Sequence, residues 1–164
     1  MMRNEDAVMN AINDAFRKKD RFRTVKDFLF QVKDARRRID LIEDRIEYRE
    51  AAMDARGANY TERLSSGHDF SGSAVEDTVM ALDELRSELA EAEKDYADAK
   101  VEVSDVIAKL EDINQQSVIT RRYISGQGWE KIAVDMDMSV RSVQKLHGRA
   151  LPILEEILKA REAA

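Results

Sequence analysis

Residues 120–151 read TRRYISGQGWEKIAVDMDMSVRSVQKLHGRAL, and their spacing predicts two short helices joined by a tight turn. The first helix is expected to begin at Trp129, because apolar residues recur three, four and seven positions after it. Ser139 is a favourable N-cap for the second helix. Val143 and Leu146 give that helix two apolar anchors on one face. We therefore expect a two-helix corner that holds the second helix outward.

The turn region contains the residue types that such a corner requires. Ala133 is small enough for two helix backbones to approach, and Met138 supplies an apolar side chain to bury in the turn. Asp137 occupies a position where many such corners have glycine, and Asp tolerates a positive φ better than most residues. Gly126 and Gly128 predict another turn ahead of the corner.

The second helix is expected to present polar side chains on the face opposite its apolar anchors. Arg and Lys can bond guanine and Gln can bond adenine, so this face suits double-stranded DNA in the major groove. The expected base-contacting residues are Arg141, Ser142, Gln144 and Lys145. Other basic residues would bind phosphates, which adds affinity without sequence information. The expected phosphate-contacting residues are Arg121, Arg122, Lys131 and Arg149.

Trp129 and His147 have the spacing of packed residues rather than of ligands. Trp129 lies on the apolar face at the start of its helix, which favours a role as a core anchor. His147 lies on the inner face of the second helix and is expected to be packed or half-buried.

The string RYISGQGWEKIAVDMDMSVRSVQKLHGRAL, residues 122–151, resembles region four of sigma-70 family factors. That pattern has an arginine-containing helix, a glycine, a glutamate-isoleucine-alanine-like helix, a serine or threonine cap and an arginine-alanine-leucine ending. Glu130 departs from it by lying one residue early, with Lys131 in the usual place of the glutamate. Pro152 is another departure, and it should kink or restart the helix because it cannot bond the carbonyl of Gly148.

The whole chain also resembles a family of small phage and prophage proteins that join a two-helix coiled segment to a sigma-like module. The resemblance covers residues 24–158 in architecture and is specific in motif over residues 119–151. It implies a phage transcription regulator that binds promoter DNA. By the same analogy, such modules can contact RNA polymerase through the helix before the turn.

Two heptad repeats in residues 24–113 predict a long antiparallel two-helix coiled-coil hairpin. Each repeat begins with a hydroxyl residue followed three positions later by an acidic one, at Thr24 and at Ser73, which resembles a capping box. Polar, glycine-rich residues 57–72 predict a flexible loop between the helices. The first seam comprises Val25, Phe28, Val32, Ala35, Ile39, Ile42, Ile46 and Met53, with Arg49 interrupting. The second comprises Val75, Val79, Leu82, Leu85, Leu89, Ala92, Tyr96, Ala99, Val103, Val106, Leu110 and Ile113.

Charge supports the pairing of these two helices. Residues 17–49 carry 12 basic and 7 acidic side chains, whereas residues 76–112 carry 4 basic and 13 acidic ones. A basic helix therefore meets an acidic one, which specifies the partner more than it stabilises the pair. The same seam could pair in trans as a homodimer, and the sequence leaves both arrangements open. Residues 121–149 are locally basic, with 6 basic and 3 acidic side chains, although the net charge of the chain is −6.

Composition sets wider limits on the fold and on the class of protein. Among 164 residues, 37% are charged, and one proline and six glycines leave long stretches without helix breakers. We expect an all-α fold with a short amphipathic helix at residues 1–20, the hairpin, and a small helix-turn-helix domain at 114–164. No apolar run approaches the ~20 residues of a membrane span, and no apolar signal region begins the chain, so we expect a cytoplasmic, nucleoid-associated protein of a bacterial host cell.

The leading functional hypothesis is a sequence-specific, DNA-binding transcription regulator, encoded by a phage or prophage. One alternative is an adaptor that docks on RNA polymerase or a sigma factor through protein contacts. Another is a DNA-packaging subunit resembling the small terminase, which also combines this motif with oligomerising helices. An enzyme is the weakest class, because cysteine is absent and neither a phosphate-cradling loop nor a paired-carboxylate motif is evident. We expect no cofactor and no metal, since the two histidines are far apart in sequence.

Overall fold

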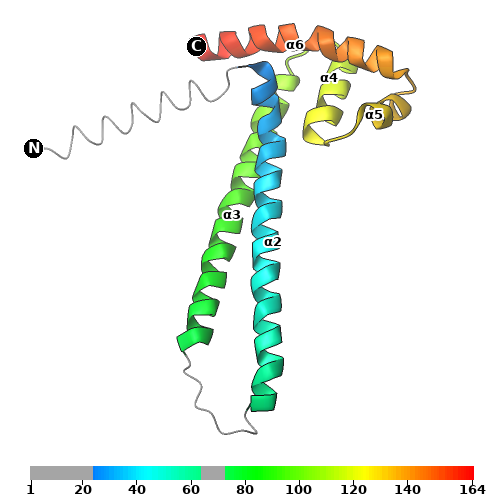
Figure 1. Cartoon of the computed structure of the whole chain (residues 1–164). Coiled ribbons are helices and arrows are strands. Elements are labelled where there is room, and N and C mark those ends of the chain that lie inside the picture. The colour runs from blue at the N-terminus through cyan, green and yellow to red at the C-terminus, as the bar shows by residue number, and fades with distance from the viewer. Residues whose placement is uncertain (1–23, 64–72) are drawn as a thin grey trace, which may run out of the picture. The chain divides into compact units, whose positions relative to one another are not determined.

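The computed structural model describes residues 24–63 and 73–164, with side chains for residues 24–57 and 76–164. The described residues are helical and contain no strand (Figure 1). The helix predicted at residues 1–20, and residues 64–72 of the predicted loop, lie outside the described residues. The described chain falls into two compact units. One contains the start of α2, up to Lys33, together with Ala99–Ala164, and the other is Asp34–Asp98.

The Asp34–Asp98 unit contains most of two long helices, α2 (Val25–Arg63) and α3 (Ser73–Ile107), which lie side by side (Figure 1). Ile39, Ile42 and Ala92 are buried between them, as the heptad seams predicted. The predicted pairing within one chain is therefore confirmed.

Ion pairs across the seam define the direction of this pairing. Arg38 contacts Asp95 at 3.3 Å, and Arg45, one heptad further along α2, contacts Glu88 at 3.2 Å, one heptad earlier in α3. Arg86 of α3 reaches Glu50 of α2 at 3.1 Å. Partner numbers in α3 fall as numbers in α2 rise, so the helices are antiparallel.

The first long helix ends later than the sequence predicted. A loop was expected from residue 57, but α2 continues through Gly57 to Arg63. A glycine inside a helix costs only about 1 kcal/mol relative to alanine, and no proline follows it to block the next turn. One glycine is therefore too weak a signal to end a helix that is already long.

The second long helix ends earlier than predicted. Its seam was expected to run to Ile113, but α3 stops at Ile107 and a new helix, α4 (Ile113–Ile119), begins. The carboxylate of Asp112 caps α4 by accepting the backbone N–H of Asn114 at 2.8 Å and that of Gln115 at 3.4 Å. This cap competes with continuation of α3. As a result, the side chain of Ile113 is 70% exposed instead of buried in the seam.

After α4 the chain makes a wide π-helical turn, η2 (Thr120–Ile124), in which the N–H of Ser125 bonds the carbonyl of Thr120 at 3.1 Å. Gly126, at φ +67°, then reverses the chain, as the predicted turn requires. The chain continues into α5 (Trp129–Asp135) and α6 (Val140–Ala163). The core shared by α4, α5 and α6 consists of Val118, Ile132, Ala133 and Val143, with Trp129, Met136, Met138, Val140 and Leu146 packed around it.

Pro152 lies inside α6, where a kink or a restart was expected, and the helix continues past it to Ala163. Its missing N–H leaves the carbonyl of Gly148 without a helical partner. Gly148 is exposed, so water can replace that bond. Ala150 and Leu154, both fully buried, anchor the helix on either side of the proline.

The start of α2 completes the unit that contains Ala99–Ala164. Phe28, Leu29 and Val32 are buried there, together with Val103 and Val106 of α3. The ring of Phe30 meets the ring of Tyr123 edge to face, with centroids 5.1 Å apart. The first turns of α2 therefore support the segment that carries the candidate site.

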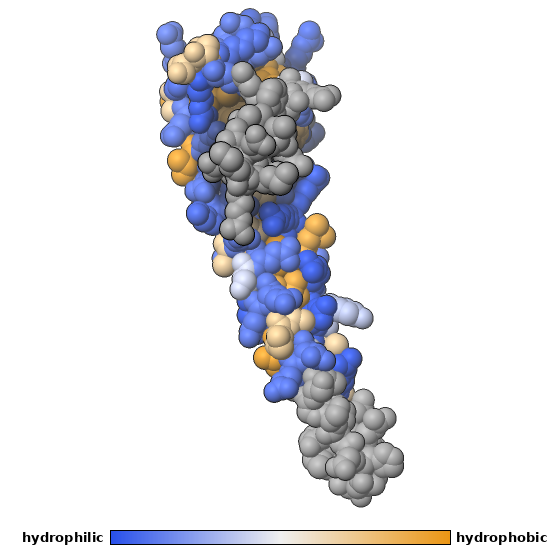
Figure 2. All heavy atoms as spheres, turned by 90° about the vertical axis from the view of Figure 1, so that its left-hand side faces the viewer, coloured by the Kyte–Doolittle hydropathy of each residue, from blue (hydrophilic) through white to orange (hydrophobic). Residues whose placement is uncertain are grey.

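Hydrophilic side chains dominate the face seen in Figure 2, and hydrophobic ones appear there in small separate groups. No described helix is both long enough and apolar enough to span a bilayer.

Candidate nucleic-acid interface

The turn between α5 and α6 has the geometry that its sequence predicted. Asp137 adopts a positive φ of 53°, and the N–H of Met138 bonds the carbonyl of Ala133 at 2.9 Å. The hydroxyl of Ser139 then caps α6 by accepting the N–H of Ser142 at 3.1 Å. The first turn of α6 is thus fixed by backbone bonds and by a side-chain cap.

The two faces of α6 differ sharply in burial. Val143 and Ala150 are fully buried, and Leu146 and His147 are partly buried beside them. The opposite face is exposed and contains Arg141, Ser142, Gln144, Lys145, Gly148 and Arg149. A side chain built at Gly148 would meet nothing within 4 Å. The face opposite the core is therefore open along two turns of helix.

The four residues predicted to contact bases differ in how free they are. In the described parts of the chain, Arg141, Gln144 and Lys145 have no ion-pair or side-chain hydrogen-bond partner. Ser142 is engaged with the cap, because its hydroxyl lies 2.9 Å from the hydroxyl of Ser139. Three of the four side chains are thus available to an outside partner.

Two of the predicted phosphate contacts share one carboxylate inside the protein. Asp135, at the end of α5, bonds Lys131 at 2.7 Å and Arg121 of η2 at 2.9 Å. The amide of Gln127 donates to the same carboxylate at 3.2 Å. The hydrogen bond from Lys131, and then the positive charges of Lys131 and Arg121, hold the pKa of Asp135 below its usual value. Asp135 therefore stays ionised and partly neutralises both cations.

The other two predicted phosphate contacts contrast with each other. Arg122 lies over the ring of Trp129, with its guanidinium carbon 4.5 Å from the ring centroid, and donates to the carbonyl of Gln127 at 3.0 Å. Arg149 is exposed and forms no ion pair with any other residue that the structure describes. Of the four predicted phosphate contacts, Arg149 is therefore the most available.

His147 is packed, as its position on the inner face predicted. Its Nε2 lies 2.9 Å from the hydroxyl of Tyr123, and the two rings stack with centroids 5.8 Å apart. The ring of Trp129 meets the other side edge-on, at 5.0 Å. Burial, and then the positive charges of Lys26 and Arg122, lower the pKa of His147, while burial raises the pKa of Tyr123. A neutral histidine thus joins α6 to α5 and η2.

Two structural carboxylates of this region were not singled out from the sequence. Asp112 stands immediately before Ile113 and three residues before Gln115, a pattern that could have marked a helix start. The contact of Asp135 with Lys131 follows i, i+4 spacing and was also readable. Its contact with Arg121, fourteen residues earlier, depends on the turn at Gly126 and was not.

No described group of three or more histidine and acidic side chains is arranged to hold a metal ion. The chain matches no protein-family model, and neither a curated protein nor a solved structure is significantly similar to it.

Proposed function

We propose that this protein is a DNA-binding transcription regulator that reads double-stranded DNA with the exposed face of α6. The observation that carries the proposal is the exposed polar face of α6, on which Arg141, Gln144 and Lys145 have no partner among the described residues. The helix-turn-helix spacing and the resemblance of residues 122–151 to sigma region four support the same function.

Charge on this face supports the proposal. Residues 139–149 contain three basic residues and no acidic one. Arg141, Lys145 and Arg149 are spaced four residues apart, so they lie along one stripe that covers about 12 Å of helix. A helix is about 10–12 Å across with its side chains, so α6 can enter a major groove that is about 12 Å wide with this stripe facing the DNA. Arg141 and Lys145 can bond guanine there, and Arg149 can bond a phosphate.

The fixed backbone of α6 supports recognition of DNA at low entropic cost. The cap at Ser139 and the buried anchors Val143 and Ala150 fix the backbone from which these side chains project. A preorganised backbone leaves only side-chain ordering to be lost on binding. The open surface at Gly148 adds room for close approach of a DNA backbone.

The test begins with selection of binding sites from a random pool of duplex DNA, using the full chain. Affinities for a selected and a scrambled duplex are then measured by fluorescence anisotropy over a range of salt concentrations. Arg141→Ala and Lys145→Ala should each reduce the preference for the selected duplex about tenfold or more. Arg149→Ala should weaken binding to both duplexes equally and lower the salt slope by about one.

Lys159→Ala is the matched control, because it removes one positive charge from a distant turn of the same helix. Lys159 is exposed and pairs with Glu155 and Glu156. This variant should bind both duplexes like the unmodified chain. If Arg141→Ala and Lys145→Ala also left binding to every duplex unchanged, α6 would not be the recognition helix. Recovery of RNA polymerase from nuclease-treated lysate, with no DNA affinity, would favour the adaptor function instead.

A further inference from the structure

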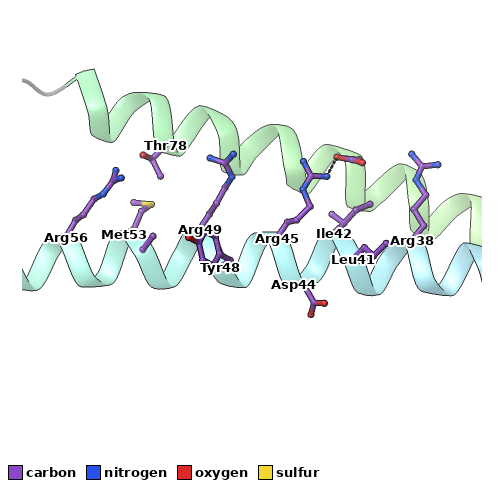
Figure 3. Close-up of a pocket in the computed structure, with 12 residues that line it drawn as sticks. Arg38, Leu41, Ile42, Asp44, Arg45, Tyr48, Arg49, Met53, Arg56 and Thr78 are labelled. Atoms are coloured by element: carbon purple, nitrogen blue, oxygen red, sulfur yellow. Dashed lines mark hydrogen bonds and ion pairs between the residues drawn. The ribbon is translucent and has the colours of Figure 1, made fainter.

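The Asp34–Asp98 unit contains a groove along α2 that the pairing of the two helices leaves unfilled. The groove has a volume of about 750 Å³ (Figure 3). Four arginines of α2 project along it toward α3, namely Arg38, Arg45, Arg49 and Arg56. Arg38 and Arg45 pair with acids of α3, whereas Arg49 and Arg56 have no ion pair within the described residues. The lining also contains Asp44 and Glu88, so the groove has a net positive charge, and its unpaired cations in the described part of the chain are Arg49 and Arg56.

Apolar side chains accompany these arginines. Leu41 and Tyr48 are seven residues apart on α2, so they lie on one face two helical turns apart. They are 63% and 78% exposed, and both line the groove. Aromatic and arginine side chains together are typical of interface centres rather than of solvated helix faces.

A second, acidic groove adjoins the first on the outer face of α3. It is lined by Met80, Asp83, Glu84, Ser87, Glu88 and Glu91. Glu88 lines both grooves, so the basic and acidic halves share a border. Met80 gives the acidic half an apolar side chain that is 64% exposed, and Glu84 and Glu91 have no ion pair within the described residues.

We propose that this two-sided surface is an interface with a second copy of the same chain. A two-fold axis along the border between the halves would place the basic half of one copy on the acidic half of the other, and the reverse. A nucleic acid fits less well, because the acidic half beside the arginines repels phosphates. A uniformly acidic protein segment would cover only the basic half. The proposal is independent of DNA binding.

The size of the surface sets the expected strength. Arg38 to Arg56 spans about 27 Å of helix, and two helices are about 20 Å wide, so each copy would bury on the order of 500 Å². A total near 1,000 Å² is at the low end of specific interfaces. The dimer is therefore expected to form in the micromolar range and to weaken as salt is raised.

The test is sedimentation velocity on the full chain from ~1 to ~200 µM, a range that brackets such a dimer. Arg49→Glu/Arg56→Glu makes both halves acidic, and Glu84→Lys/Glu91→Lys removes the net negative charge of the acidic half by replacing two of its four carboxylates with lysine. Each double variant alone should shift the dimer constant at least tenfold toward monomer. An equimolar mixture of the two should dimerise again, because the lysines of one variant then face the glutamates of the other.

Glu47→Lys/Glu93→Lys is the control matched to Glu84→Lys/Glu91→Lys, since it makes the same charge change as that variant at exposed positions outside both grooves. It should dimerise like the unmodified chain, and circular dichroism should show unchanged helix content in all variants. A monomer at every concentration overturns the proposal, as does failure of the mixture to restore the dimer. If the unmodified chain stays monomeric and Arg49→Glu/Arg56→Glu abolishes binding of a DNA duplex, the basic groove binds nucleic acid and the dimer proposal is wrong.

Discussion

The hairpin of residues 34–98 and the segment from α4 to α6 bury their apolar residues in different ways. In the hairpin, each buried layer contains residues of two helices, as at Ile39, Ile42 and Ala92. The layers repeat every heptad, as from Leu85 to Ala92. In the C-terminal segment, three helices converge on one core whose residues Val118, Ile132 and Val143 are fully buried. The hairpin therefore tolerates local change, whereas one substitution in the smaller core affects all three helices around it.

The largest expected effect is a truncation in the smaller core. Ile132→Ala should lower the free energy of unfolding by about 3–5 kcal/mol, because the convergent helices cannot collapse into the cavity. Ile42→Ala in the hairpin should cost nearer 2 kcal/mol, since two helices can move together to close the gap. Both are measured by urea unfolding. Equal losses of unfolding free energy in Ile132→Ala and Ile42→Ala would show that the two cores tolerate truncation equally well.

Val134→Ala is the control for that measurement. Val134 lies in the same short helix, two residues after Ile132, and is 77% exposed. Its truncation should change the free energy of unfolding by no more than about 0.5 kcal/mol. A larger loss would mean that α5 is buried by a partner in solution.

The next effect concerns the start of α6. Ser139→Ala removes the cap on the N–H of Ser142 and should cost about 1 kcal/mol of stability. Ser139→Asp should restore it, because Asp is an equally good cap and its charge suits a helix N-terminus. Thermal unfolding of the three chains checks this order. If Ser139→Ala were as stable as the unmodified chain, packing alone would set the start of α6.

A smaller effect is a pH dependence from His147. Burial lowers the pKa of His147 from its ordinary 6.5, so the unfolded chain binds the proton more readily. The contribution of the neutral His147 to the free energy of unfolding is complete above pH 6.5, and it is lost as the pH falls from 6.5 toward the lowered pKa. Because the ring is only half-buried, this loss should be smaller than that of the cap. His147→Gln should flatten the stability curve between about pH 7.5 and 5.5, and an unchanged curve would exclude His147 as its source.

The smallest effect is expected from the ion pairs of the hairpin. A double-mutant cycle on Arg45 and Glu88, each changed to alanine, should give a coupling energy of no more than about 0.5 kcal/mol, because both side chains are solvated. A coupling energy several times larger would show that these pairs stabilise the hairpin, rather than only specifying its register.

The sequence by itself determined the features that depend on local spacing. Heptads at Ile39 and Ile42 predicted the hairpin, and the cap at Ser139 with the turn at Asp137 predicted the start and face of α6. Two helix ends were predicted wrongly. Gly57 was expected to end the first long helix, but a single glycine is outweighed by a long helical pattern. The break before Ile113 was missed, because the single capping residue Asp112 is a weak signal beside a long heptad seam.

Only the tertiary structure decided which cations of the candidate site are available. Asp135 binds Arg121 and Lys131, and Arg122 lies over Trp129, while Arg149 remains open. The turn at Gly126 brings Arg121 to Asp135, and the fold likewise places Phe30 against Tyr123. Helix periodicity reports which residues share a face, but contacts between distant segments depend on how the chain turns, and a single sequence encodes that only weakly.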